Sequence, residues 1–397
     1  MKRILLAIPL PYGTDWGYWT RDPSGLTALA LRQMGYDAWL VALDSDQPLD
    51  DKPVIRASME ELGNAEWWKA QRPDGVVLNT WSAFRYDAIR RAARAATPQV
   101  LERLDTDGFR SARLFPAQLC LRNWGAYRDK LPPLLRWLAG PLAAGRVSFL
   151  YLFPALMDAR VVATMHEVAG LIVESPIAGE RIQKMMVAFS GKEQRIRVIP
   201  HPVDEDDITY VEVPKENRII TVGRWSASQK DFPMVLRVLK KFLQIHPDWT
   251  ATVVGGGVPA RYRSRATAGE EWERRVIYPD KLGHKELAKE YARSKIYLMA
   301  SRHESFCIAA AEALYCGCSV VGSSAIPSAS YFAETASGTV APERTPQAFV
   351  EAMQQEVDAW AHGRRDPQAI AAIWRDRAGS HDVARATLEF LESIPAA

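Results

Sequence analysis

Short apolar runs alternate with helix-like segments along the first hundred residues of the chain. Strands are predicted over Ile4–Leu10, Tyr36–Leu43, Val76–Asn79 and Gln99–Leu104, and helices over Asp22–Gly35 and Ala88–Ala96. Asp22 can cap the first helix, Pro23 suits its first position, and Gly35 can close it. Strands alternating with helices predict a parallel sheet with helical crossovers, which is a doubly wound α/β domain.

The same alternation begins again at Arg218. Further strands are predicted over Arg218–Val222, Trp249–Val254, Lys295–Ser301 and Ser319–Gly322. The helix between the last two ends at Gly317, the residue type that most often follows a helix. The segment 200–217 is rich in proline and acidic residues, and 397 residues suit two domains. We therefore expect one domain over 1–200, a second over 201–379, and a final helix within 380–397.

Two carboxylates, Glu304 and Glu312, flank the predicted start of the helix before Gly317. Eight residues of continuous helix would separate them by about 80° and about 12 Å, so they cannot share one proton. We expect Glu304 in the loop before the helix and Glu312 two turns into it, with Ser305 as the N-cap. The free N–H groups of such a helix start suit a phosphate.

Composition limits the classes of function. The net charge of +3 gives no reason to expect nucleic-acid binding, and no apolar run approaches the 18 residues of a membrane-spanning helix. The four cysteines, Cys120, Cys307, Cys316 and Cys318, have no disulfide-framework spacing. We expect a cytoplasmic protein with buried thiols and no bound metal or cofactor.

One segment, 103–160, is both basic and apolar. Its cations are Arg103, Arg110, Arg113, Arg122, Arg128, Lys130, Arg136, Arg146 and Arg160, and its acids are Asp105, Asp107, Asp129 and Asp158. Basic amphipathic segments with tryptophan can lie on anionic membranes, which would place the protein at the inner face of a membrane. The alternative, which Pro132, Pro133 and Pro141 favour, is an ordinary core helix with a solvated face.

The stretch 295–324 resembles the retaining glycosyltransferases of family 4, which have the GT-B fold. The resemblance rests on a strand ending in Ser301, Glu304-Ser305-Phe306, the second carboxylate of a Glu-x7-Glu pair, a Cys-Gly-Cys turn and a Val-Val strand. A Gly-Arg turn at Gly223-Arg224 with Lys230 six residues later is also similar to the family. Cys307 stands where the family usually has glycine, and its Cβ narrows the approach to a donor sugar.

The resemblance implies two Rossmann-like doubly wound domains facing a central cleft. The N-terminal domain would bind the acceptor and the C-terminal domain the nucleotide sugar, and the final helix would cross back to the N-terminal domain. Catalysis is expected from Glu304, Arg224 and Lys230. The donor is expected to meet Glu312, Ser305, Phe306, Cys307, Ile308, Gly223, Gly25 and Tyr278. Asp105, Asp107 and His303 are the candidates on the acceptor side.

In these roles the two cations hold the donor diphosphate, because the leaving group gains negative charge as the sugar departs. Glu312 accepts from the ribose hydroxyls, and Glu304 orients the donor sugar. The expected reaction is metal-independent transfer of a hexosyl group, from a UDP-linked donor before a GDP- or ADP-linked one, to a small-molecule, glycan or lipid-linked acceptor.

Several alternatives stay open. A nucleotide-sugar 2-epimerase or a disaccharide phosphorylase would have the same fold, and a non-catalytic nucleotide-sugar binder would fit Cys307. A metal-dependent GT-A enzyme would use an Asp-x-Asp motif. The pairs Asp44/Asp46, Asp105/Asp107 and Asp204/Asp206 have that spacing but no matching context. The acceptor, the sugar and the oligomeric state are not determined by these patterns.

Overall fold

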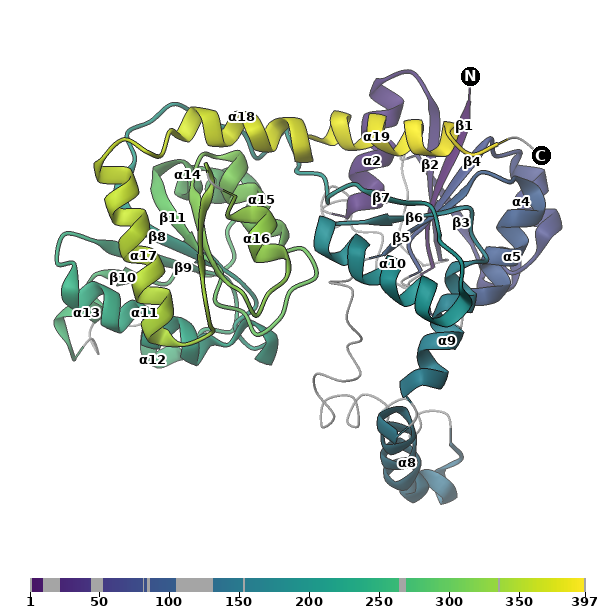
Figure 1. The fold of residues 1–397 in the computed structure, drawn as a ribbon, viewed down its shortest axis with the longest axis horizontal. Helices are drawn as coiled ribbons and strands as arrows, with labels where there is room; N and C mark the ends of the chain where they lie inside the picture. The colour runs from purple at the N-terminus through teal and green to yellow at the C-terminus, as the bar shows by residue number, and fades with distance from the viewer. Residues whose placement is uncertain are drawn as a thin grey trace.

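The computed structural model describes residues 2–9, 22–43, 53–80, 82–83, 86–104, 131–152, 154–263, 269–334 and 336–395. They form two parallel sheets, each covered by helices on both faces (Figure 1). The expected doubly wound α/β architecture is therefore confirmed.

The first sheet has seven parallel strands in the order β3-β2-β1-β4-β5-β6-β7. Its strands are β1 (Arg3–Ile8), β2 (Asp37–Leu43), β3 (Val54–Ala57), β4 (Gly75–Leu78), β5 (Val100–Leu104), β6 (Gly170–Val173) and β7 (Ile196–Val198). Its helices are α2 (Pro23–Gln33), α3 (Met59–Leu62), α4 (Ala65–Gln71), α5 (Asp87–Ala96), α9 (Pro154–Met165) and α10 (Pro176–Ser190). A 3₁₀ helix, η2 (Pro133–Leu138), and helix α8 (Ala139–Leu152) precede α9.

The second sheet has six parallel strands in the order β10-β9-β8-β11-β12-β13. Its strands are β8 (Glu216–Val222), β9 (Thr250–Val254), β10 (Val276–Ile277), β11 (Ser294–Leu298), β12 (Ser319–Ser323) and β13 (Gly338–Ala341). Its helices are η3 (Ser228–Lys230), α11 (Phe232–Ile245), α12 (Ala260–Arg263), α13 (Glu271–Arg274), α14 (His284–Arg293), α15 (Ile308–Tyr315), α16 (Ser328–Phe332), α17 (Pro346–Ala361) and α18 (Pro367–Ala378). In both sheets the strand order reverses beside the first strand, which creates a crevice at the carboxyl ends.

Local signals explain the start and end of α2. The Asp22 carboxylate accepts a hydrogen bond from the Ser24 backbone N–H at 2.9 Å, and Pro23 occupies the first helical position. After the helix, Gly35 has φ of +90°, a conformation that glycine adopts without strain. The predicted helix is confirmed, and it ends at Gln33 one turn before the chain reaches β2.

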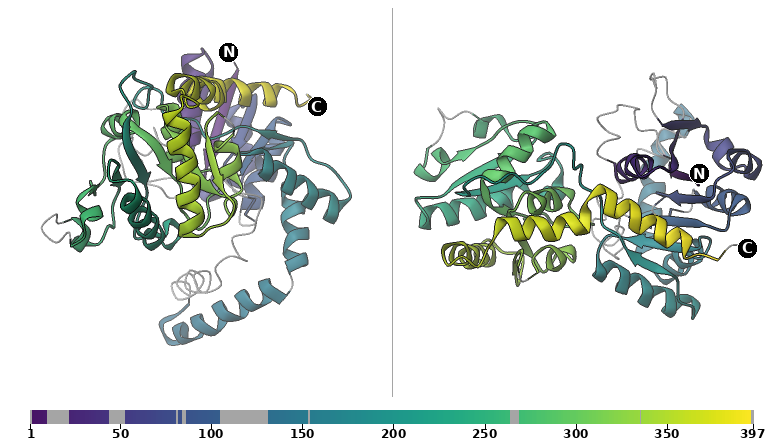
Figure 2. Two further views of the ribbon diagram at one scale, coloured as in Figure 1. Left: turned by 60° about the vertical axis from the view of Figure 1, so that its left-hand side comes forward. Right: turned by 90° about the horizontal axis from the view of Figure 1, so that it is seen from above.

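The last helix, α19 (Ser380–Glu392), leaves the second sheet and packs on the first domain. Val383, Leu388 and Leu391 join the same apolar cluster as Leu6 of β1 and Leu31 of α2. Figures 1 and 2 show α18 and α19 crossing from one domain to the other. The first strand, β1, and the last helix, α19, therefore lie in the same domain.

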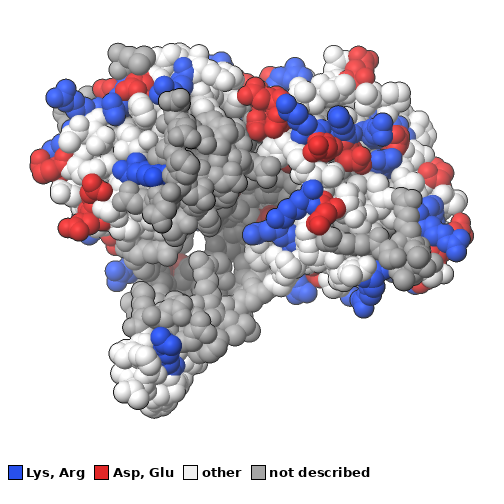
Figure 3. Space-filling view, turned by 180° about the vertical axis from the view of Figure 1, so that it is seen from behind, with Lys and Arg blue, Asp and Glu red and all other residues white. Residues whose placement is uncertain are grey.

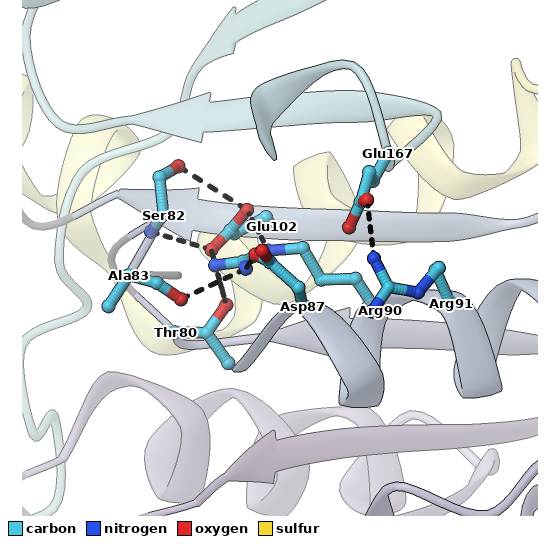
Figure 4. A network of polar contacts seen from close by, with 8 residues as sticks. All are labelled: Thr80, Ser82, Ala83, Asp87, Arg90, Arg91, Glu102 and Glu167. Carbon is cyan, nitrogen blue, oxygen red and sulfur yellow. Dashed lines mark hydrogen bonds and ion pairs between the residues drawn. The ribbon is translucent and has the colours of Figure 1, made fainter. Parts of the chain in front are cut away.

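A buried ion pair lies within the first domain, near the carboxyl ends of β4 and β5 (Figure 4). The Arg90 guanidinium donates to both oxygens of Glu102, at 2.7 and 3.0 Å, and neither side chain is exposed. Glu102 also accepts from the Ser82 backbone N–H at 2.8 Å and from the Thr80 hydroxyl. Glu102 and Arg90 thus anchor the chain that follows β4.

Candidate functional site

Most of the predicted donor residues gather where the strand order of the second sheet reverses. Gly223 and Arg224 follow β8, and residues 301–304 follow β11, the strand paired with β8. Open parallel sheets bind ligands outside the carboxyl ends of their strands at such a point. The fold therefore brings two segments about 80 residues apart in the chain to the place that the topology favours for a ligand.

The Gly-Arg turn is held by a second turn after β9. The Trp225 indole donates to the Val254 carbonyl at 2.9 Å, and the Trp225 backbone N–H donates to Gly256 at 2.8 Å. A Cβ at Gly255, which has φ of +123°, would lie 2.0 Å from the Gly223 carbonyl oxygen. Glycine at 255 is required for this close approach, so the glycine stretch after β9 positions the turn that carries Arg224.

Lys230 and Glu304 form an ion pair across the two segments. The Lys230 ammonium lies 2.6 Å from Glu304 Oε1, and the Gln229 amide donates to Glu304 Oε2 at 3.2 Å. Gln229 also donates to the His303 carbonyl at 3.0 Å, and its own carbonyl accepts from the Arg302 N–H at 2.7 Å. The loop bearing Glu304 is therefore fixed against the short η3 helix.

The charge state of this pair follows from its surroundings. Burial opposes the charge on Lys230, but the Cys307 sulfur and the Glu304 carboxylate together raise its pKa above the ordinary value. Burial, with Glu304, raises the pKa of the Cys307 thiol to about 11. The raised pKa of Lys230 favours its ammonium form beside the Glu304 carboxylate.

Arg224 stands apart from this pair. Its side chain is exposed, and the described residues offer its guanidinium no hydrogen bond or ion pair. A free guanidinium with five donors suits the oxygens of a diphosphate. Arg224 and Lys230 can thus present two cations at the same edge of the sheet.

The helix after Glu304 begins later than its sequence predicts. Ser305 is not the N-cap, because α15 starts at Ile308 and Cys307 occupies the capping position without a side-chain cap. Glu312 is consequently the fifth helical residue, about one turn in rather than two. Residues 304–307 form the loop, so the first free N–H groups of the helix follow Cys307.

Cys307 has backbone angles of φ +80° and ψ +76°. This left-handed conformation is unfavourable for residues that carry a Cβ, and it explains physically why glycine is the expected residue here. The side chain is buried, and its sulfur lies 3.7 Å from the Tyr297 hydroxyl. Phe306 is also buried, with its ring 4.9 Å from that of Phe332, so only its backbone can serve a ligand.

Glu312 is nearly buried on α15. Its Oε2 accepts from the Tyr291 hydroxyl of α14 at 3.1 Å. Burial, with Glu312, raises the pKa of Tyr291 well above its usual value, so the phenol stays a donor. Tyr291 fixes the orientation of the carboxylate, and nothing in the sequence pattern pointed to it.

The remaining predicted residues are more scattered. Tyr278 directly follows β10 at the carboxyl edge of the second sheet and packs against the ring of Tyr262. Gly25 lies in the first turn of α2, on the other domain. His303 precedes Glu304 and is half-buried. Asp105 and Asp107 lie outside the described residues.

The sequence did not predict a second set of contacts that holds the loop after β11. Asp231 forms ion pairs with Arg344 and with Arg302, the latter at 3.2 Å, and Arg344 also donates to the Ser301 carbonyl at 2.9 Å. Asp231 and Arg344 are 113 positions apart in the chain, so no local pattern could reveal them.

One group of side chains has metal-ligand chemistry. In the described part of the chain, ligand atoms of Asp204, Asp207 and His284 lie within 4.8 Å of one another. Lys285 Nζ already lies 3.6 Å from Asp207, and His284 lies 3.5 Å from Asp204. Contacts among these side chains and Lys285 account for this cluster, which shares no residue with the Lys230–Glu304 pair.

Comparison with a family model supports the resemblance in the C-terminal half. Residues 203–365 match the model described as glycosyl transferases group 1. This segment is therefore a glycosyltransferase domain, and the expectation of a glycosyltransferase enzyme is confirmed. No curated protein sequence matches the chain.

Solved structures resemble the whole chain. Sucrose-phosphate synthase from Thermosynechococcus elongatus has 16% identity and a TM-score of 0.63, covering 99% of this chain and 98% of its own. Anabaena HepE in complex with UDP has 13% identity and a TM-score of 0.63, with 99% and 100% covered. The lipopolysaccharide outer core galactosyltransferase WaaB has 13% identity and a TM-score of 0.65, with 99% of both chains covered. At these identities the likeness establishes the fold, and the fold is GT-B.

Proposed function

We propose that the chain is a retaining glycosyltransferase that transfers a hexosyl group from a nucleoside diphosphate sugar, with UDP as the first nucleotide to test. The observation that carries the proposal is the convergence of Arg224, Lys230 and Glu304 at the switch point of the second sheet, with Glu312 on the helix beyond. Structures of HepE with UDP-glucose and of trehalose-6-phosphate synthase with UDP-2-fluoro glucose share the fold, which supports UDP as the starting choice.

The proposed roles follow from charge and position. Arg224, with its unengaged guanidinium, and Lys230 would hold the diphosphate and stabilise the negative charge that develops as the sugar leaves. Glu304 would orient the donor sugar beside Lys230. Glu312 would accept from the ribose hydroxyls, in the orientation that Tyr291 imposes. The N–H groups from Phe306 to Ile308 would meet sugar and phosphate oxygens.

In the proposed reaction the acceptor attacks from the face that the diphosphate leaves. The bond between the anomeric carbon and the phosphate oxygen breaks as the acceptor oxygen bonds to the same carbon. Because the new bond forms on the face that the diphosphate leaves, the configuration is retained, and the departing phosphate oxygen takes the acceptor proton. Two fixed cations neutralise the leaving group in place of a divalent ion.

The test uses water as the acceptor, because no natural acceptor is needed for it. Purified protein with UDP-glucose in EDTA should release UDP, and proton NMR should show the α anomer of glucose before mutarotation. Arg224→Ala should lower this rate by about 10²–10³-fold. Arg237→Ala, an exposed arginine on α11, is the matched control and should leave the rate unchanged.

Other outcomes would redirect the proposal. A rate lost in EDTA and restored by Mn²⁺ would refute metal independence. Appearance of the 2-epimer of the donor would indicate an epimerase, and strict dependence on phosphate would indicate a phosphorylase. Tight donor binding without hydrolysis or transfer would indicate a non-catalytic binder, the candidate that the Cβ of Cys307 favours.

A further inference from the structure

Helices η2 and α8 form an arm that lies apart from both sheets. The arm, residues 131–152, connects to the N-terminal domain through α9 (Figures 1 and 2). In Figure 1 it extends from the N-terminal domain on the side opposite the crossing of α18 and α19. It is therefore not the core helix that the prolines in this segment favour.

The end of the arm exposes large apolar side chains. The exposed fractions are 89% for Leu134, 71% for Trp137, 45% for Leu142 and 43% for Leu135. These four, within nine consecutive residues, are a third of the twelve exposed large hydrophobic side chains of the described chain. Contiguous exposed apolar surface of this kind marks an interaction site, whereas single exposed residues do not.

The charge of the same segment has one sign. No acidic residue occurs between Lys130 and Asp158, while Arg136 and Arg146 do. Arg136 is exposed beside Trp137. Figure 3 shows the described surface of the arm as white and blue, in contrast to the mixed red and blue of both domains.

The chemistry of the arm distinguishes a lipid surface from a protein partner. Over residues 131–157 the only side chains with polar atoms are Arg136, Trp137, Arg146, Ser148 and Tyr151. A protein interface uses a polar rim with about one hydrogen bond per 100–200 Å², which this segment cannot supply. A bilayer surface needs only apolar anchors, interfacial tryptophan and cations near anionic headgroups.

The length of the arm excludes a spanning role for it. Helix α8 has 14 residues and would be about 21 Å long, shorter than the hydrocarbon core of a bilayer. No helix in the described residues is long and apolar enough to cross a membrane. The arm could therefore contact a bilayer only at its surface.

We propose that the exposed end of the arm, residues 131–142, docks the protein on a bilayer that contains anionic lipids. Leu134 and Trp137 enter the boundary between headgroups and acyl chains, and Arg136 stays among the headgroup phosphates. This proposal does not rest on the donor site, which lies on the other domain.

The test is sedimentation of the full chain with sucrose-loaded vesicles at about 100 mM salt, where surface charges still act. Vesicles of phosphatidylcholine with phosphatidylglycerol should bind the protein, and pure phosphatidylcholine should bind it at least tenfold more weakly. Leu134→Ser and Trp137→Ser should each weaken binding about tenfold, since each removes an apolar side chain that enters the bilayer on binding. Arg136→Ser should weaken it about fivefold.

Ile245→Ser is the matched control. Ile245 is 62% exposed on α11 of the other domain, and its replacement should leave vesicle binding unchanged. Equal loss in the control and arm variants, equal binding to both vesicles, or no binding to either would overturn the proposal. Light scattering could also overturn it. If the protein is a dimer, and Trp137→Ser dissociates the dimer but leaves vesicle binding intact, the arm contacts a second copy of the chain. Calorimetry measures the affinity for UDP without vesicles, so failure of the donor site and failure of membrane binding can be told apart.

Discussion

At the scale of single residues, Cys307 has a backbone conformation that suits glycine. Replacing it by glycine should stabilise the protein relative to alanine by about 1 kcal/mol, because only glycine avoids the penalty of positive φ. Both replacements remove the thiol, so the difference between their free energies of unfolding reports the cost of the backbone conformation at position 307. Urea unfolding of Cys307→Gly and Cys307→Ala measures it. If alanine is the more stable, φ at 307 is not positive in solution.

Removal of the Glu304 carboxylate, in the loop before α15, and of the Glu312 carboxylate, on α15, should affect UDP affinity differently. Glu312→Ala should weaken UDP affinity about 10- to 150-fold, the equivalent of one charge-assisted bond of about 1.5–3 kcal/mol. Glu304→Ala should leave UDP affinity equal or higher, because it releases Lys230, now 2.6 Å from that carboxylate, for the diphosphate. Calorimetry with UDP compares them. The reverse order would refute the assignment of ribose to Glu312 and sugar to Glu304.

At the scale of elements, the buried Arg90–Glu102 pair joins α5 to β5. Arg90→Met should destabilise the protein by about 3–5 kcal/mol, since the buried Glu102 would lose the guanidinium that pairs with both of its oxygens. The double variant Arg90→Met/Glu102→Leu should lose less than this single one. Arg91→Met is the control, because Arg91 is 63% exposed in its pair with Glu167. Urea unfolding monitored by circular dichroism gives the three values.

If the double variant is less stable than Arg90→Met, the Arg90–Glu102 pair is not the main contribution of Glu102 to the stability of the fold. The bonds from Glu102 to Thr80 and Ser82 would then matter more, because they hold the chain after β4. Figure 4 shows both groups of contacts around the same carboxylate.

Elements with local signals could be predicted from the sequence, and contacts across the sheets could not. The Asp22-Pro23 start of α2 and the Gly317 end of α15 depend on neighbouring residues, and both match the structure. The predicted start of α15 was wrong. Ser305 is a good capping residue by type, but the helix begins after Cys307, whose conformation is set by the loop. The Lys230–Glu304 and Tyr291–Glu312 contacts depend on strand order, which apolar periodicity does not specify.

At the scale of the whole molecule, the chain crosses between the domains twice. The first crossing runs through residues 199–209, and the second joins α18 to α19. Val203 donates its N–H to the Ala378 carbonyl at 2.7 Å and pairs with Gly379 as a parallel bridge. At the first crossing the ring centroids of His201 and Phe306 are 5.5 Å apart, so the loop before α15 contacts the segment that links the domains. Any change in the angle between the domains must strain this shared region.

Glu205 connects the two crossings to the donor helix. It accepts from Tyr315 of α15 at 2.7 Å, from the Ser380 hydroxyl, and from the His381 ring at 3.2 Å. Burial opposes its charge, but these hydrogen bonds outweigh burial and hold its pKa below 4.5. The charged form is therefore favoured in the folded state, which links this contact to pH.

The stability that Glu205 contributes should be present above its unfolded pKa, near 4.5, and should be lost as pH falls through its lower folded pKa. Glu205→Gln cannot titrate and accepts these bonds more weakly. The melting temperature of the wild type should therefore exceed that of Glu205→Gln most at about pH 6, and the difference should shrink by about pH 3.5. Glu212→Gln, an exposed carboxylate on the same linker, should show no such trend. A difference that stays constant with pH would mean that Glu205 acts through shape and packing rather than charge. The two crossings would then not be joined by an ionised contact.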